Sequence, residues 1–398
     1  MEFFKKKLKN GITVLFEKRD LPIVSVSITN RFGGAYEKSE IKGIAHLIEH
    51  LVFTGTKTRT HEDISREIEK KGGILNAFTS HEVTSFWFKM PSKHLFAGLD
   101  ILTDMLNNSK FDKEKFDKEK KVVLEEIKMY HDDPRRSVFD QLEKNMFEKP
   151  FGELVIGNEE TISNLERDFV ADFFEKAYNS ENYIVTIVGE ADFSKVCDYF
   201  EKNFKAGKKE QKILKIVRKN KESTEEKGNL DQAHFVFGTH TPLPSDKIYP
   251  AIEVLDAYLA NGMSSRLFLE IREKRGLAYV VSSSLESEKS YGYYVIYVGT
   301  RKEAVDEVKK LILEGFREVS KMNEKDLEEA KERLIGLKKV RSEESVNVMN
   351  SLMLDELVGD ARDYYEWDKK INAVKLEDVK KIAKMLVKDY STAAIVPK

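Results

Sequence analysis

The stretch Gly43-Ile-Ala-His-Leu-Ile-Glu-His-Leu-Val-Phe53 decides how the rest of the chain is interpreted. Its apolar residues predict a buried helix. Residues four apart lie on one face of a helix, so His46 and His50 can bind one metal ion together. Glu49 follows His46 by three residues and emerges beside the two histidines. Two neutral imidazoles with a neighbouring carboxylate suit zinc, and an open coordination position would make the site catalytic.

A core helix whose histidines are satisfied by backbone groups is the alternative interpretation. Burying two histidines and a glutamate on an otherwise apolar helix is costly unless a strong partner is present, and a divalent cation is such a partner. The order His-x-x-Glu-His is also the inverted form of a common metal-binding helix motif. These two arguments favour the metal site.

Length and composition limit the possible classes of protein. A chain of 398 residues, 41% of them hydrophobic, predicts two or more domains with large cores. The net charge of −2 gives no reason to expect nucleic acid as a partner. The single cysteine, Cys197, excludes an intrachain disulfide and a cysteine zinc site. No stretch approaches about 18 uncharged apolar residues, and the N-terminus lacks a secretion signal, so we expect no membrane span and a cytoplasmic location.

Apolar periodicity predicts an alternating series of strands and helices. The predicted strands cover 11–17, 22–32, 74–80, 82–90, 182–188, 233–238, 278–283, 292–298 and 392–396. The predicted helices cover 43–53, 61–71, 92–107, 112–131, 136–146, 161–177, 252–259, 264–274, 302–319, 324–342, 344–357 and 376–388. A polar, charge-dense segment predicts a linker over 211–230, with room for one short strand. It separates an N-terminal domain, 1–210, from a C-terminal domain, 231–398.

The two halves end in matching patterns of a helix followed by an apolar strand. Aligning the halves replaces the three residues of the metal helix, His46, Glu49 and His50, by Glu253, Asp256 and Ala257. The second half is therefore expected to bind no metal. We predict an α+β fold of two homologous domains, each a mostly antiparallel sheet flanked by helices and related by internal duplication. The mixed order of elements argues against a doubly wound sheet.

A third metal ligand is expected on the helix over 112–131, because two imidazoles need a further ligand, usually a carboxylate in such sites. Glu119 and Glu126 are seven residues apart and lie on one helix face with Val122 and Val123. A solvated Lys/Glu helix is the alternative by pattern alone.

Several motifs together resemble the insulinase, or pitrilysin, family of inverted-motif zinc peptidases. They are similar to the half-size members, such as the mitochondrial processing peptidase beta subunit and its bacterial relatives. The motifs are Gly43-Ile-Ala-His-Leu-Ile-Glu-His50, Phe53-Thr-Gly-Thr56, Gly72-Gly-Ile-Leu-Asn-Ala-Phe-Thr-Ser80, Val122-Val-Leu-Glu-Glu-Ile127 and Glu270-Ile-Arg-Glu-Lys-Arg-Gly-Leu-Ala-Tyr279.

The resemblance implies one zinc ion per chain and a role for each site residue. His46, His50 and Glu126 would be the ligands. Glu125 is the competing candidate, but the family pattern places the ligand just before the Ile of Glu-Ile. Glu49 would be the base that activates a water molecule, and Glu119 would orient a ligand histidine.

The resemblance also implies how a peptide would be held. Asn76, Ala77 and Phe78 would belong to an edge strand that pairs with an extended substrate, although turn statistics alone allow Asn76 to be a turn residue. Arg272 and Tyr279 would donate hydrogen bonds to a substrate carbonyl or the oxyanion. By spacing alone, these two residues would be a surface charge and a half-buried strand aromatic.

Half-size members enclose substrate in a clam-shell chamber of four such domains, so a two-domain chain must pair with another. Because both functional halves are present, we expect a homodimer in which Arg272 and Tyr279 of one subunit serve the zinc of the other. The expected function is endopeptidase cleavage of peptides or unfolded segments. The alternatives are a peptidase that processes leader peptides and a non-catalytic assembly subunit of the same fold.

Overall fold

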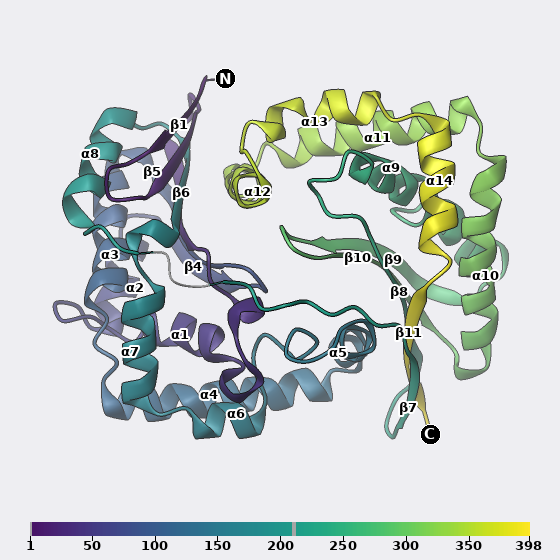
Figure 1. Ribbon diagram of the computed structural model, residues 1–398, viewed down its shortest axis with the longest axis horizontal. Helices are drawn as coiled ribbons and strands as arrows, with labels where there is room; N and C mark the ends of the chain where they lie inside the picture. Colours follow the sequence, from purple (N-terminus) through teal and green to yellow (C-terminus); the bar gives the residue numbers. More distant parts are fainter. Residues whose placement is uncertain (1, 209–211) are drawn as a thin grey trace. The chain divides into compact units, whose positions relative to one another are not determined.

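The computed structural model describes residues 2–208 and 212–398, and the chain divides into two compact units (Figure 1). Unit 1 comprises Met1–Lys128, Glu153–Lys215 and Arg341–Tyr364. Unit 2 comprises Met129–Gly152, Ile216–Val340 and Tyr365–Lys398. Each unit therefore contains a segment from the opposite half of the chain.

Unit 1 is built on a six-stranded sheet. Its strands are β1 (Glu2–Lys7), β2 (Thr13–Lys18), β3 (Ile23–Asn30), β4 (Ile74–Thr79), β5 (Thr84–Pro91) and β6 (Tyr183–Gly189). Its helices are α1 (Ile44–Val52), α2 (His61–Glu69), α3 (Leu95–Asn108), most of α4 (Lys113–Asp132), α6 (Glu159–Asn164), α7 (Arg167–Ala177), α8 (Phe193–Asn203) and α12 (Ser345–Val358).

Unit 2 is built on a five-stranded sheet. Its strands are β7 (Glu222–Lys227), β8 (Ala233–His240), β9 (Ala278–Ser287), β10 (Gly292–Thr300) and β11 (Tyr390–Pro397). Its helices are α5 (Pro134–Met146), α9 (Tyr249–Leu259), a π-helix (Phe268–Lys274), α10 (Val305–Glu318), most of α11 (Glu324–Arg341), most of α13 (Asp363–Asn372) and α14 (Leu376–Leu386).

The two sheets have the same topology. The strand order is β1-β2-β6-β3-β5-β4 in unit 1 and β7-β11-β8-β10-β9 in unit 2. In each sheet one pair is parallel, β2 with β6 and β7 with β11, and every other pair is antiparallel. Strands β2 to β6 thus correspond in chain order to β7 to β11, and β1 is an additional edge strand. The predicted fold class, two mostly antiparallel sheets flanked by helices, is confirmed.

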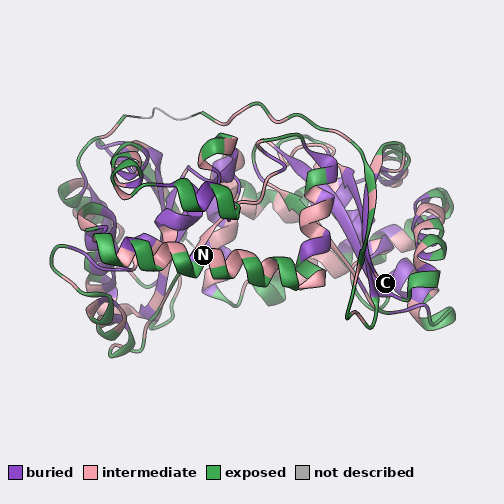
Figure 2. Cartoon of the chain, turned by 90° about the horizontal axis from the view of Figure 1, so that it is seen from below, coloured by how far each residue is buried: buried purple, intermediate pink, exposed green. Residues whose placement is uncertain are grey.

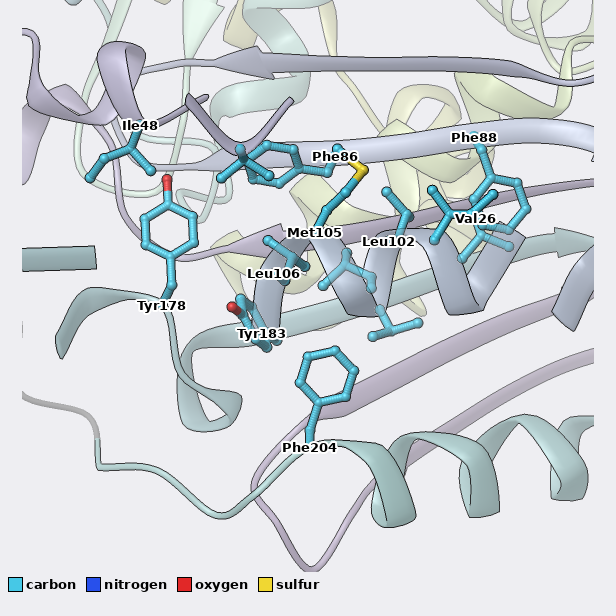
Figure 3. Close-up of a cluster of buried hydrophobic side chains, with 14 of the residues drawn as sticks. Val26, Ile48, Phe86, Phe88, Leu102, Met105, Leu106, Tyr178, Tyr183 and Phe204 are labelled. Atoms are coloured by element: carbon cyan, nitrogen blue, oxygen red, sulfur yellow. The ribbon is translucent and has the colours of Figure 1, made fainter. Parts of the chain in front are cut away.

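Successive side chains of β3 point to opposite faces of the sheet, which explains why helices pack on both faces in unit 1. Val24, Val26 and Ile28 point into the apolar core beneath α1, α3, α7 and α8. Figure 3 shows part of this core, in which Ile48 of α1 lies near Tyr178. The inner strands β2, β3, β5 and β6 are mostly buried, whereas the covering helices have exposed outer faces (Figure 2).

The opposite face of each sheet is covered by a helix from the other half of the chain. In unit 1, α12 packs on β6 and β3, where Ser345 lies 2.8 Å, oxygen to oxygen, from Ser25. In unit 2, α5 packs on β11 and β8, where Leu142 and Met146 contact Gly238. This reciprocal exchange was not predicted from the sequence. The domain boundaries proposed from the sequence stay a prediction.

Three elements, β1, α8 and α13, were not predicted from the sequence, and the extent of one predicted helix was wrong. The helix predicted over 161–177 is two helices, α6 and α7, because Leu165 and Glu166 adopt extended backbone between them. The helix predicted over 264–274 is confirmed in its position, and Phe268–Lys274 forms a π-helix. Among the described residues, none of the helices combines the length and apolar character needed to span a bilayer.

Candidate active site

Helix α1 begins at a tightly constrained glycine. Gly43 has φ +94°, and a Cβ atom there would lie 2.7 Å from the carbonyl oxygen of Ile156 and 2.8 Å from Cα of Gly157. The buried carboxylate of Glu37 accepts hydrogen bonds from the backbone N–H groups of Gly43, at 3.0 Å, and Ala45, at 2.7 Å. Glu37 therefore replaces the missing N-cap side chain and fixes where α1 begins.

His46 and His50 on α1 meet Glu126 on α4. The Oε2 atom of Glu126 lies 3.4 Å from Nε2 of His50 and 3.7 Å from Nε2 of His46. Each of the three residues offers a ligand atom within 4.8 Å of the others. Two ligand atoms about 2.1 Å from a tetrahedral zinc ion would be about 3.4 Å apart. The donor set and its spacing therefore fit a single zinc ion.

Glu119 and Glu125 differ clearly in their surroundings. An oxygen of Glu119, Oε2, lies 3.5 Å from Nδ1 of His50, on the opposite side of the imidazole from Glu126. Glu125 points away, since its side chain is 72% exposed and it accepts a hydrogen bond from Lys128. Glu125 and Glu126 are the two adjacent candidates for the third metal ligand, and only Glu126 faces the histidines.

The electrostatic environment suits a cation. Burial, together with the neighbouring His50, lowers the pKa of His46 to about 4, so its imidazole is neutral at pH 7. Burial also opposes protonation of His50, but the hydrogen bonds with Glu119 and Glu126 outweigh it and raise that pKa to about 9. A pKa raised by two carboxylates indicates a negative local potential, which favours a positive ion between these side chains.

Glu49 lies on α1 between the two histidines and faces β4. Burial raises the pKa of Glu49, while a hydrogen bond from Thr79 opposes the increase. The Thr79 hydroxyl donates to Oε2 of Glu49 at 2.5 Å. The predicted base is therefore held by the last residue of β4.

The three residues predicted to bind substrate lie on an edge strand. Asn76, Ala77 and Phe78 of β4 pair with Trp87, Phe86 and Ser85 of β5, and no strand of the described residues pairs with the other edge of β4. Asn76 is exposed, and its Oδ1 atom accepts a hydrogen bond from the N–H of Ala77.

Arg272 and Tyr279 come together within unit 2. The guanidinium carbon of Arg272 lies 4.9 Å from the ring centre of Tyr279 and 4.8 Å from that of Phe268. Arg272 belongs to the π-helix, and Tyr279 is the second residue of the edge strand β9. Tyr279 is 77% exposed, so its hydroxyl group is available to a ligand.

Two residues of this site are not identified by sequence reasoning. Thr79 stands inside one of the motifs described above, but nothing in its spacing indicates a contact with Glu49. Glu37 caps α1 from six residues before Gly43, beyond the usual capping positions. Both contacts join α1 to residues outside that helix, and local sequence patterns do not encode such tertiary contacts.

Known proteins are similar to this chain along most of its length. The family model "Insulinase (Peptidase family M16)" matches residues 13–159, and "Peptidase M16 inactive domain" matches residues 164–334. The Bacillus subtilis (strain 168) protein named "Uncharacterized zinc protease YmxG" is 32% identical over 98% of this chain and 97% of its own. A Mycobacterium leprae protein named "Uncharacterized zinc protease ML0855" is 32% identical over 98% of this chain and 91% of its own.

Solved structures share the fold. A protease from Helicobacter pylori superposes with a TM-score of 0.91 at 22% identity, covering 100% of this chain and 99% of that one. A Pseudomonas fluorescens structure described as a peptidase M16 inactive domain superposes with a TM-score of 0.92 at 19% identity, covering 100% of this chain and 98% of that one. Given a relative that is 32% identical along nearly the whole length of both proteins, this chain belongs to the insulinase family, peptidase family M16.

Proposed function

We propose that this chain is a zinc-dependent metalloendopeptidase that hydrolyses peptides or unfolded segments. The observation that carries the proposal is the approach of His46, His50 and Glu126 to one another, with Glu49 on the same helix as the two histidines. The relatives named as zinc proteases support the choice of metal. A bound zinc ion would supply Lewis-acid chemistry, polarising a carbonyl and making water more acidic.

The residues of the chain would divide the remaining work. Glu49 takes a proton from the attacking water and later gives it to the leaving amine. Glu119 orients His50 through the Nδ1 side of its imidazole, as outer carboxylates commonly do for metal-binding histidines. Glu126 adds a negative ligand from the second helix.

The edge strand β4 would hold the substrate. An extended peptide can add to an open sheet edge through backbone hydrogen bonds, which accept many different side chains. Asn76, Ala77 and Phe78 would form this contact, and the open edge of β4 supports the proposal. The preference would therefore be for unfolded segments and for peptides over folded proteins.

The active site would be shared between the two subunits of a homodimer. Arg272 and Tyr279 would donate hydrogen bonds to the oxyanion that forms next to the metal of the other subunit. The exposed hydroxyl of Tyr279 supports this role. Mixing the inactive variants Glu49→Gln and Tyr279→Phe should give more peptidase activity than either variant alone. A mixture that is no more active than the separate variants would count against an active site shared between subunits.

A zinc analysis combined with a peptide-library digest tests the function. The wild-type chain should contain one zinc per chain and cleave internal peptide bonds. The Glu49→Gln variant should keep the zinc and lose turnover, and near wild-type cleavage by that variant would show that Glu49 is not the base. Cleavage confined to leader sequences would favour the processing alternative, and a chain that binds no zinc and cleaves nothing would favour the assembly-subunit alternative. Cell fractionation would test the predicted cytoplasmic location.

A further inference from the structure

The carboxylate of Glu49 receives a single hydrogen bond within the part of the chain that the structure describes. The donor is the hydroxyl group of Thr79, 2.5 Å from Oε2. The other carboxylate oxygen, Oε1, has no donor among the described residues. One oxygen of the proposed base is thus held by the protein, and the other is left to interact with water.

The Thr79 hydroxyl is well placed to hold Glu49 because its own position is fixed. Thr79 pairs with Thr84 at the end of β4 and β5. The following turn is closed by a hydrogen bond from the N–H of Ser80 to the carbonyl of Val83. The turn is also anchored from outside, since the N–H of Gly34 donates to the carbonyl of Ser80. A β-branched residue in a strand has restricted χ1 freedom, so the position of the hydroxyl oxygen is restricted before substrate binds.

Glu49, by contrast, needs an external constraint. A glutamate side chain has three rotatable bonds, and an unheld carboxylate would spread over several conformations. Thr79 orients Glu49 in the same way that Glu119 orients His50. Because β4 is also the strand proposed to pair with the peptide, one strand positions both the substrate and the base.

We infer that Thr79 is a positioning residue for peptide hydrolysis, whose hydroxyl aims the Glu49 carboxylate at the attacking water. The inference rests on the proposed function. Losing a hydrogen bond to a charged group at this point should lower kcat about tenfold to a hundredfold. KM should change little, since Thr79 is not expected to contact the peptide through its hydroxyl.

Three variants test the inference in the zinc-loaded, full-length chain. Thr79→Val removes the hydroxyl and keeps the shape, whereas Thr79→Ser restores a hydroxyl. Thr84→Val is the matched control, because Thr84 is the cross-strand neighbour of Thr79 and its hydroxyl donates to the carbonyl of Phe32 instead. We expect Thr79→Val to lose kcat with unchanged zinc content, Thr79→Ser to recover most of it, and Thr84→Val to keep kcat even if its melting temperature falls.

Crystal structures of the wild type and Thr79→Val provide a readout that does not need activity. Glu49 should occupy one conformation in the wild type and several in the variant. If Glu49 is unchanged in Thr79→Val, or if Thr79→Ser is as slow as Thr79→Val, the inference is overturned. A wild type that cleaves no peptide would refute the proposed function instead, while the conformations of Glu49 would still decide whether Thr79 positions it.

Discussion

Replacing Gly43 by alanine should destabilise unit 1 far more than the same change at another glycine with positive φ. Gly72 is the matched control: it has φ +70°, and a Cβ atom added there would have no atom within 4 Å, whereas Gly43 has φ +94° and crowded neighbours. A left-handed backbone costs a non-glycine residue about 1–2 kcal/mol. Both variants carry that cost.

Only Gly43→Ala carries an additional steric cost. Its Cβ would meet the backbone of Ile156 at 2.7 Å and of Gly157 at 2.8 Å, and backbone atoms cannot rotate away as a flexible side chain can. Overpacking of this kind costs about 1–3 kcal/mol. The total for Gly43→Ala is then about 2–5 kcal/mol, against about 1–2 kcal/mol for Gly72→Ala.

Thermal unfolding of the two variants measures the difference. One kcal/mol shifts the melting temperature of a unit of this size by about 2–4 °C, so Gly43→Ala should melt several degrees below Gly72→Ala. Zinc affinity should also fall in Gly43→Ala, because the change displaces the first turn of the helix that carries both histidines. Equal melting temperatures for the two variants would refute the claim that close backbone contact at Gly43 fixes α1.

Further predictions concern the metal and pH. Glu126→Gln should weaken zinc binding at least tenfold, whereas Glu125→Gln should leave it unchanged. Competition with a chelating dye measures the zinc affinity of both variants, and a larger loss in Glu125→Gln would make Glu125 the ligand. Removing the metal with a chelator should lower the melting temperature, since a ligand at a thousand times its Kd adds about 4 kcal/mol, and zinc should restore it; an unchanged melting curve would argue against a metal in unit 1. Burial, with Glu143 nearby, raises the pKa of Asp140 to about 6, so the stability associated with its neutral form is present below pH 4 and lost as pH rises through 6. Asp140→Asn should therefore exceed the wild type in stability by about 2–3 kcal/mol at pH 7.5 and match it near pH 4, and denaturant titrations showing no such crossover would contradict this.

The sequence predicted those features that depend on local periodicity. Helix α1 lies where the His-x-x-Glu-His stretch placed it, and the strands around it follow the alternation of apolar residues. The pairing of Glu126 with the histidines came from a family resemblance and not from spacing, because its helix is largely polar. The exchange of α5 and α12 depends on contacts between residues that lie far apart in the sequence. No local pattern distinguishes a helix that packs on its own sheet from one that packs on the other.

The two units place a carboxylate at the same position of corresponding helices, and they provide it with different polar partners. Helix α9 lies between β8 and β9, as α1 lies between β3 and β4, and aligning the halves puts Asp256 in the place of Glu49. Asp256 is buried and accepts hydrogen bonds from Ser283, Tyr294 and Asn261. A buried carboxylate needs donors or a cation, and in unit 2 two hydroxyls and an amide supply them. In unit 1 the corresponding helix receives one hydroxyl, from Thr79, and its histidines face the carboxylates of Glu119 and Glu126. The polar groups there are incompletely matched by protein donors alone, which is the condition under which a metal ion adds most to the stability of the helix.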